Sequence, residues 1–217
     1  TEIKNILIVK LDHLGDVILG MPAMRMIRDK FPAANITLLC GSYAKGIAER
    51  IPYIDDIITF DFFNERSENG QRQFTKDELK VLHKICNSKQ FDLAIDLRRH
   101  PETRGVLSFT NSKYKIGYWF YSEDYKWMTT CLDLEGINDK RGADGMLKPH
   151  ITAQMCNLVK TSFSIEDNLI PEVTFKLKDT DNTIFEKYPQ LLNNNNVICI
   201  LPGTGAPVRQ WSLEYYA

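Results

Sequence analysis

Residues 6–16 read ILIVKLDHLGD, and this stretch decides the fold. Its first four residues are aliphatic and mostly β-branched, which is typical of a strand buried on both faces of a parallel sheet. A loop from Lys10 to Gly15 follows, and apolar residues then recur at helical spacing between residues 17 and 31. Pro22 interrupts this spacing, so we expect the helix to kink there or to restart with Pro22 in its first turn.

The same alternation of strand and helix continues along the chain. Apolar runs predict further strands at residues 36–40, 57–60, 93–97 and 114–118, with a possible strand at 173–175. Helices are predicted at residues 43–50, at 75–86 (with a capping box of Thr75 and Glu78), from residue 102, and at 150–163. Strands joined by helices pair in parallel through right-handed crossovers. The predicted fold is therefore α/β, a Rossmann-like doubly wound parallel sheet; residues 118–147 carry no recognisable pattern.

A second domain is predicted to begin near the end of the chain. Residues 193–196 form an uninterrupted polar linker, residues 197–201 are a buried-strand run, and residues 202–207 form a loop with two glycines. Because this repeats the opening of the chain, we assign residues 1–192 to one domain and residues 193–217 to the start of another. Thr1 stands where a Met would begin a gene product, and the pattern stops midway, so we expect the chain to be part of a longer protein.

Composition excludes several classes of protein. The 217 residues are 43% hydrophobic and 25% charged, with a formal charge of -1, so no global charge favours nucleic-acid binding. The five cysteines are odd in number and scattered, which favours reduced thiols in a cytoplasmic protein over disulfides or zinc. Residues 1–217 contain no run of eighteen apolar residues, so we expect no membrane span. No Cys/His spacing typical of a metal site appears among the cysteines, and we expect no metal.

Two polar clusters follow predicted strands, where ligands bind in a doubly wound sheet. The first is the loop with Asp12, His13, Gly15 and Asp16, which lacks both the GxGxxG and the GK[ST] pattern. Gly15 lets backbone approach a ligand closely, and Asp16 places a carboxylate at a helix start. The structural alternative is that Asp16 caps or stabilises the helix, by about 0.5–1 kcal/mol, and that Asp12 and His13 are solvated loop residues.

The second cluster contains Arg98, Arg99 and Arg104, just after the fourth predicted strand. Arginine forks suit carboxylate and phosphate groups, so an anion site is one interpretation, which Lys113 and Lys115 would extend. A solvated basic turn is the other. Acids such as Asp61 are interpreted as loop residues.

Residues 6–61, with the pattern K/R-x-D-x-x-GD, resemble the opening of glycosyltransferase family nine, the ADP-heptose:lipopolysaccharide heptosyltransferases. The resemblance continues at residues 91–98, 202–204 and 210–212. It implies the N-terminal, acceptor-side half of a GT-B type two-domain enzyme that inverts the sugar's configuration without a cofactor. It makes Asp16 the catalytic base that takes the proton of the acceptor hydroxyl.

The resemblance also implies partners and binding residues. A nucleotide-diphosphate sugar, ADP-heptose, is the implied donor, with Gly15, Thr204 and Arg209 on the donor side. A lipopolysaccharide or other surface glycan is the implied acceptor, with contacts from Asp12, His13, Arg98, Arg99 and Arg104. Lipid-linked acceptors imply peripheral contact with the cytoplasmic face of the inner membrane. A non-catalytic nucleotide-sugar or glycan-binding module is the alternative, and the fragment alone is expected to be inactive.

Overall fold

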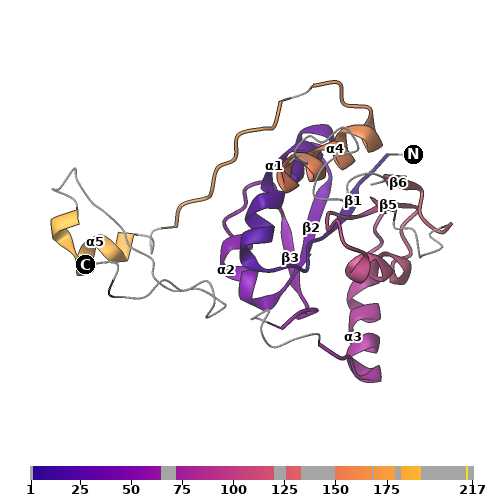
Figure 1. Cartoon of the computed structure of the whole chain (residues 1–217), viewed down its shortest axis with the longest axis horizontal. Coiled ribbons are helices and arrows are strands. Elements are labelled where there is room, and N and C mark those ends of the chain that lie inside the picture. Colours follow the sequence, from indigo (N-terminus) through magenta and orange to yellow (C-terminus); the bar gives the residue numbers. More distant parts are fainter. Residues whose placement is uncertain are drawn as a thin grey trace.

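A computed structural model describes residues 2–64, 72–119, 126–132, 150–167, 169–178, 182–191 and 214. Its centre is a six-stranded parallel sheet in the order β3-β2-β1-β4-β5-β6 (Figure 1). The strands are β1 (Asn5–Val9), β2 (Asn35–Cys40), β3 (Asp56–Thr59), β4 (Leu93–Asp96), β5 (Tyr114–Tyr118) and β6 (Thr130–Leu132). The predicted α/β, doubly wound class is thus confirmed. The order reverses between β1 and β4, and ligands bind beside such a reversal in this class of sheet.

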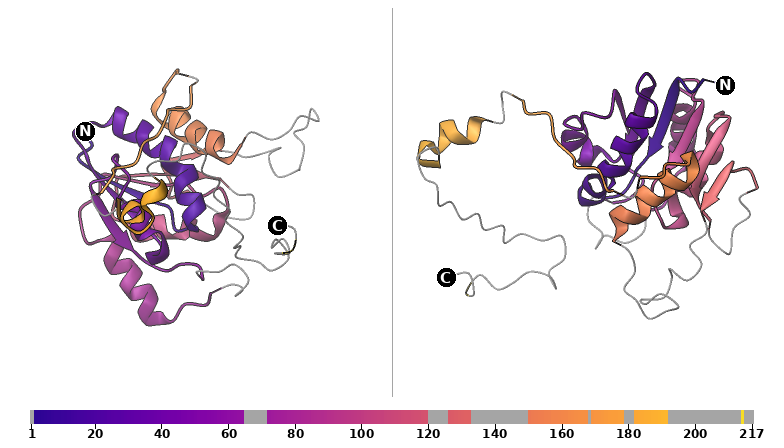
Figure 2. Two further views of the ribbon diagram at one scale, coloured as in Figure 1. Left: turned by 90° about the vertical axis from the view of Figure 1, so that its left-hand side faces the viewer. Right: turned by 90° about the horizontal axis from the view of Figure 1, so that it is seen from above.

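Helices cover both faces of the sheet (Figure 2). One face packs against α1 (Leu14–Lys30), η1 (Ser42–Ala44), α2 (Lys45–Ala48) and α4 (Ile151–Phe163), and the other against α3 (Lys76–Cys86) and η3 (Pro101–Phe109). In β1, Ile6 and Ile8 face the first layer, while Leu7 and Val9 face the second. All four are 0% exposed, which explains why the strand is apolar from Ile6 to Val9.

Helix α1 runs without a break from Leu14 to Lys30, with Pro22 inside it. Of the two alternatives expected at Pro22, a kink or a restart, the restart is therefore wrong. Proline removes one backbone hydrogen bond from a helix interior. Here Pro22 is buried together with its neighbours Met21 and Ala23 against the sheet, and this packing offsets the missing bond.

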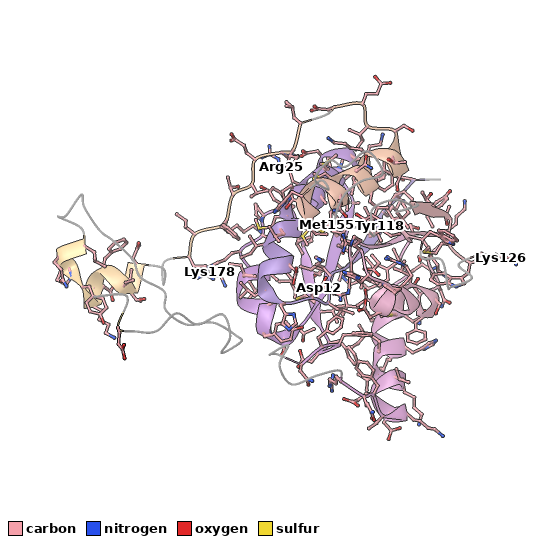
Figure 3. All side chains as sticks on the ribbon, in the orientation of Figure 1. Asp12, Arg25, Tyr118, Lys126, Met155 and Lys178 are labelled. Carbon is pink, nitrogen blue, oxygen red and sulfur yellow. The ribbon has the colours of Figure 1, made fainter. Side chains whose placement is uncertain are left out.

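The segment after α4 runs back along the outside of α1 towards α2. Residues 173–175 are not a strand, contrary to the expectation from their sequence. The Thr174 amide donates instead to the Tyr53 hydroxyl at 3.0 Å, and Lys178 forms an ion pair of 2.7 Å with Glu49. Figure 3 shows Arg25 and Lys178 along this path, and Arg25 Nη1 donates to the Glu172 carbonyl at 2.5 Å. The segment then leads to α5 (Thr183–Lys187) and η5 (Pro189–Leu191).

Some of the other predicted elements are present in the structure, and others lie outside the described residues. The capping box of Thr75 and Glu78 is present at the start of α3, and β5 lies where it was predicted. The helix expected from residue 102 is the 3-10 helix η3, and β6 was not predicted. The polar linker at 193–196 and the strand at 197–201 lie outside the described residues, so the domain boundary stays a prediction. None of the described helices is both long enough and apolar enough to cross a bilayer.

Candidate functional site

Asp16 lies at the edge of the sheet where β1 ends, beside the reversal of strand order. Helix α1 begins at Leu14, so Asp16 is in its first turn, and the Asp16 amide donates to the His13 carbonyl at 2.9 Å. The Asp16 carboxylate is partly exposed, and among the described residues it accepts no hydrogen bond and forms no ion pair. A Cβ added to Gly15 would meet nothing within 4 Å, so the space beside this turn is open. A ligand can therefore reach both residues.

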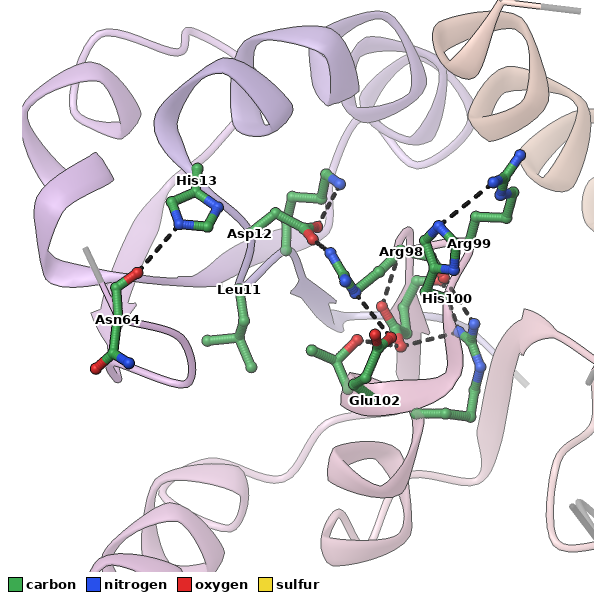
Figure 4. A network of polar contacts seen from close by, with 12 residues as sticks. Leu11, Asp12, His13, Asn64, Arg98, Arg99, His100 and Glu102 are labelled. Carbon is green, nitrogen blue, oxygen red and sulfur yellow. Dashed lines mark hydrogen bonds and ion pairs between the residues drawn. The ribbon is translucent and has the colours of Figure 1, made fainter. Parts of the chain in front are cut away.

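Asp12 is the buried centre of an ion-pair network. Its side chain is 1% exposed; Oδ2 lies 2.5 Å from Lys10 Nζ, and Oδ1 is paired with Arg98 Nη1 (Figure 4). A buried charge is tolerated when it is paired in this way. Lys10 and Asp12 belong to the loop after β1, whereas Arg98 follows β4. The network thus fastens the two loops that flank the reversal.

The guanidinium of Arg98 is paired with two carboxylates and lies over one aromatic ring. Besides Asp12, its Nε lies 3.3 Å from Glu102 Oε2, and its guanidinium lies over the Phe63 ring at 4.6 Å from the centroid. Arg99 points elsewhere and donates to His100 Nε2 at 3.3 Å (Figure 4). Of the two neighbouring arginines, Arg98 is the one held by carboxylates.

Arg104 does not lie on a solvated basic turn, and it is buried rather than at the acceptor surface where the sequence placed it. Its side chain is 1% exposed, with Nη1 2.9 Å from Asp96 Oδ2 and Nη2 donating to the Arg98 carbonyl at 2.6 Å. A Cβ at Gly117 would overlap its guanidinium. Position 104 points inward because η3 turns that side of the chain onto the sheet. Arg104 therefore fixes the end of β4 from inside.

Arg104 neutralises the charge of Asp96, which is buried. Asp96 is 0% exposed, accepts from the Thr103 hydroxyl at 2.9 Å and from the Arg98 amide at 2.9 Å, and ends strand β4. Burial raises the pKa of Asp96, and the charge of Arg104 opposes that rise. The pair is a structural element beneath the loop that carries Arg98 and Arg99.

His13 joins the β1 loop to aromatic residues of neighbouring loops. Its Nε2 donates to the Asn64 carbonyl at 3.1 Å, so this nitrogen carries the proton. The ring stacks against Tyr43 and Phe63, with centroids at 5.8 and 6.3 Å. His13 is thus ordered rather than a solvated loop residue. The sequence gives no signal for this contact, because its partners lie 30 and 50 positions away.

A polar hollow of about 260 Å³ opens beside this aromatic group. Its lining comes from the ends of β2 and β3: Ser42, Tyr43, Asp61, Phe63, Asn64 and Arg72. Asp61, interpreted from sequence as a loop acid, accepts from the Ser42 amide at 2.6 Å and from the Ser42 hydroxyl at 2.9 Å. The position of Asp61 directly after a predicted strand was the available signal for a site residue.

Lys10 is a cation buried among acids. Its side chain is 4% exposed and forms an ion pair with Asp12 at 2.5 Å. Burial lowers the pKa of Lys10 from 10.5 to about 8, and the carboxylates of Asp16 and Asp96 oppose this shift. At neutral pH its ammonium still balances the acids around it.

We expect Lys10 to titrate with a midpoint near pH 8, observed by NMR at its ε-methylene and assigned by loss of that signal in Lys10→Met. Between pH 8 and 10.5 the unfolded chain holds more protons on this group than the folded one. The contribution of Lys10 to stability is therefore complete above pH 10.5 and is lost as the pH falls through 8. A midpoint at 10 or above would show that the ammonium is not buried as described.

Of the residues predicted on the donor side, Thr204 and Arg209 lie outside the described residues. Cys40, Cys86 and Cys156 are buried free thiols, and burial raises the pKa of Cys40 and Cys86 to about 12. Within the described ranges, no three His, Cys, Asp or Glu side chains are grouped so as to hold a metal.

The arrangement of the chain matches solved glycosyltransferases. A crystal structure of a family 9 glycosyl transferase from Veillonella parvula DSM 2008 aligns over 100% of this chain and 58% of its own, with a TM-score of 0.71 and 17% identity. The fold is that of glycosyltransferase family nine. E. coli ADP-heptose lps heptosyltransferase II aligns over 85% of this chain and 50% of its own, with a TM-score of 0.58 and 15% identity.

Sequence comparison agrees with this family-nine fold. A curated relative from Haemophilus influenzae, named "Putative glycosyltransferase", is 32% identical over 99% of this chain and 58% of its own length. No family model matches the chain. E. coli heptosyltransferase WaaC with ADP-2-deoxy-2-fluoro heptose aligns over 78% of this chain and 50% of its own, with a TM-score of 0.55 and 14% identity. The predicted resemblance is confirmed, and the chain spans 50–58% of the length of these proteins.

Proposed function

We propose that this chain is the acceptor-side part of an inverting glycosyltransferase that transfers heptose from ADP-heptose to a lipopolysaccharide or another surface glycan. One observation carries the proposal. At the reversal of strand order, Asp12 and Asp96 are buried and paired, whereas Asp16 is partly exposed and unpaired among the described residues. Asp16 is thus the acid of this group that is available to a substrate.

The chemistry needs one carboxylate in this position. Asp16 accepts the proton of an acceptor hydroxyl as its oxygen attacks the anomeric carbon of the donor. The bond from that carbon to the diphosphate breaks on the opposite face, so the configuration inverts and the nucleoside diphosphate leaves with the bonding electrons. A carboxylate in the first turn of a helix is held rigidly by the buried strand before it, which keeps the base in place.

The other predicted residues have separate roles in this proposal. His13 and Arg99 contact the acceptor, while Asp12, Arg98 and Arg104 hold the loops on which these residues lie. Gly15 leaves open space at the amino end of α1, where a donor phosphate is favoured by the helix dipole. From the family resemblance, Thr204 and Arg209 approach the donor diphosphate and stabilise its departure. The family resemblance also supports peripheral action at the cytoplasmic face of the inner membrane.

The whole protein, incubated with ADP-heptose and deacylated surface glycan from cells lacking the gene, tests this proposal. We expect a new heptosyl linkage whose anomeric configuration, read from NMR coupling constants, is opposite to that of the donor. Retained configuration would contradict the single-displacement mechanism. Binding of ADP-heptose without any transfer would support the alternative, a non-catalytic nucleotide-sugar or glycan-binding module. The present chain alone is expected to be inactive, because it spans only 50–58% of the length of its relatives.

A further inference from the structure

The polar hollow at the ends of β2 and β3 lies next to the proposed base. Tyr43 lines the hollow and stacks on His13, which is three residues before Asp16. The Tyr43 hydroxyl donates to the Leu11 carbonyl at 3.2 Å, in the loop that leads to Asp16. The hollow is therefore connected, through Tyr43 and His13, to the loop and helix turn that carry Asp16.

The cation that lines the hollow is already neutralised. Arg72 is ion-paired with Glu78 at the start of α3, and its guanidinium lies over the Phe74 ring at 5.2 Å from the centroid. Arg98, whose guanidinium lies over the Phe63 ring, is paired with Asp12 and Glu102. Among the described residues that line the hollow, Asp61 is the charged side chain that has no ion-pair partner.

Asp61 is held in a fixed orientation and keeps acceptor capacity. Its two oxygens each accept one hydrogen bond from Ser42. An ionised carboxylate has about four lone-pair positions, so about two remain for hydroxyl donors. Hydroxyl groups of a sugar supply such donors, whereas a phosphate brings acceptors and like charge, which is repelled.

The remaining lining suits the apolar side of a sugar ring. The Tyr43 and Phe63 rings flank the hollow, and an aromatic face carries negative charge density that attracts the weakly positive C–H groups of a pyranose. Apolar walls with a small number of fixed polar groups are the usual composition of a small-molecule site. The volume of about 260 Å³ is enough for one sugar ring.

We propose that this hollow binds a neutral, hydroxyl-bearing sugar of the acceptor, and that Asp61 is the residue that selects it over a phosphorylated one. That this sugar belongs to the acceptor rests on the proposed transfer reaction, whereas binding of the sugar itself does not depend on that reaction. Asp61 touches the sugar hydroxyls, and Ser42 positions its carboxylate. A phosphorylated sugar is excluded by the charge of Asp61.

Sugar binding to the whole protein tests the inference without relying on turnover. The probes are methyl α-D-mannopyranoside and D-mannose 6-phosphate, titrated by saturation-transfer NMR. We expect the neutral sugar to bind several-fold more tightly than the phosphate. Asp61→Asn should weaken binding of the neutral sugar about five- to tenfold, because a charged acceptor becomes a neutral one. The same variant should reduce the discrimination against the phosphate.

The control is Asp29→Asn, the same chemical change on α1 at the opposite edge of the sheet, where Asp29 is 63% exposed. It should leave both affinities unchanged, and equal thermal midpoints for the two variants exclude a folding defect. Tighter binding of the phosphate, unchanged binding in Asp61→Asn, or no binding of either probe overturns the inference. A protein that binds the neutral sugar but transfers nothing to any acceptor contradicts the proposed transferase and leaves the sugar site standing.

Discussion

Asp16→Asn in the whole protein is expected to lower kcat for sugar transfer by about 10²–10⁴-fold, the usual contribution of a general base. The amide has nearly the shape of the carboxylate but cannot take the proton of the acceptor hydroxyl. Because Asp16 forms no ion pair among the described residues, its replacement removes no structural contact there. Donor affinity, measured by calorimetry with ADP-heptose, should change little, while the rate at saturating substrates falls.

Two companion variants make the Asp16 result specific. Asp29→Asn changes an exposed acid at the other end of the same helix and should keep the wild-type rate. Asp16→Glu keeps the carboxylate but displaces it by about one bond length, and a misplacement of about 1 Å can cost about a hundredfold in rate. Near wild-type transfer by Asp16→Asn, with normal donor binding, would show that another group is the base.

Arg104→Ala is expected to lower the free energy of unfolding by about 3–5 kcal/mol, as is usual when one partner of a buried ion pair is removed. Asp96 would remain 0% exposed without the guanidinium that now neutralises it. The variant also loses the hydrogen bond from Arg104 to the Arg98 carbonyl, which holds the loop after β4. Urea denaturation followed by circular dichroism measures the change.

Arg99→Ala is the matched control for Arg104→Ala. It removes the same kind of side chain five positions earlier, where Arg99 is partly exposed and contacts His100. Substitutions away from buried networks usually change stability by about 0.5 kcal/mol or less. Equal stability of the two variants would contradict the structural role of Arg104 and would restore it as a ligand-binding candidate. The double variant Asp96→Asn, Arg104→Met should recover part of the loss, because it leaves no unpaired charge.

The strands and the location of the site could be predicted because they depend on local patterns. The run from Ile6 to Val9 can bury both faces only inside a sheet, and the glycine and acid that follow it mark a strand-to-helix turn. The prediction at residues 173–175 was wrong for the opposite reason. Their apolar alternation fits a strand, but the Thr174 amide bonds to the Tyr53 hydroxyl rather than to a neighbouring strand.

The roles of the charged residues could not be predicted from the same patterns. Arg98, Arg99 and Arg104 look alike in sequence, yet one bridges two loops, one is partly exposed, and one is buried. Side-chain burial depends on how η3 packs on the sheet, and the periodicity of residues 101–109 does not specify that. The sequence did not predict Asp61 as a site residue for a related reason, because its partner Ser42 comes from the end of another strand.

The sequence by itself determined the parallel α/β sheet and the position of Asp16 at the end of its first strand, because hydrophobic spacing and turn residues act over a few positions. Only the tertiary structure decided which charges meet. Asp12 is buried between Lys10 and Arg98, while Asp16, four residues later, stays open to a ligand. That difference arises because strands β1 and β4 lie side by side, with Val9 paired to Asp96 although the two are 87 positions apart in the chain. Electrostatic partners are set by proximity in space.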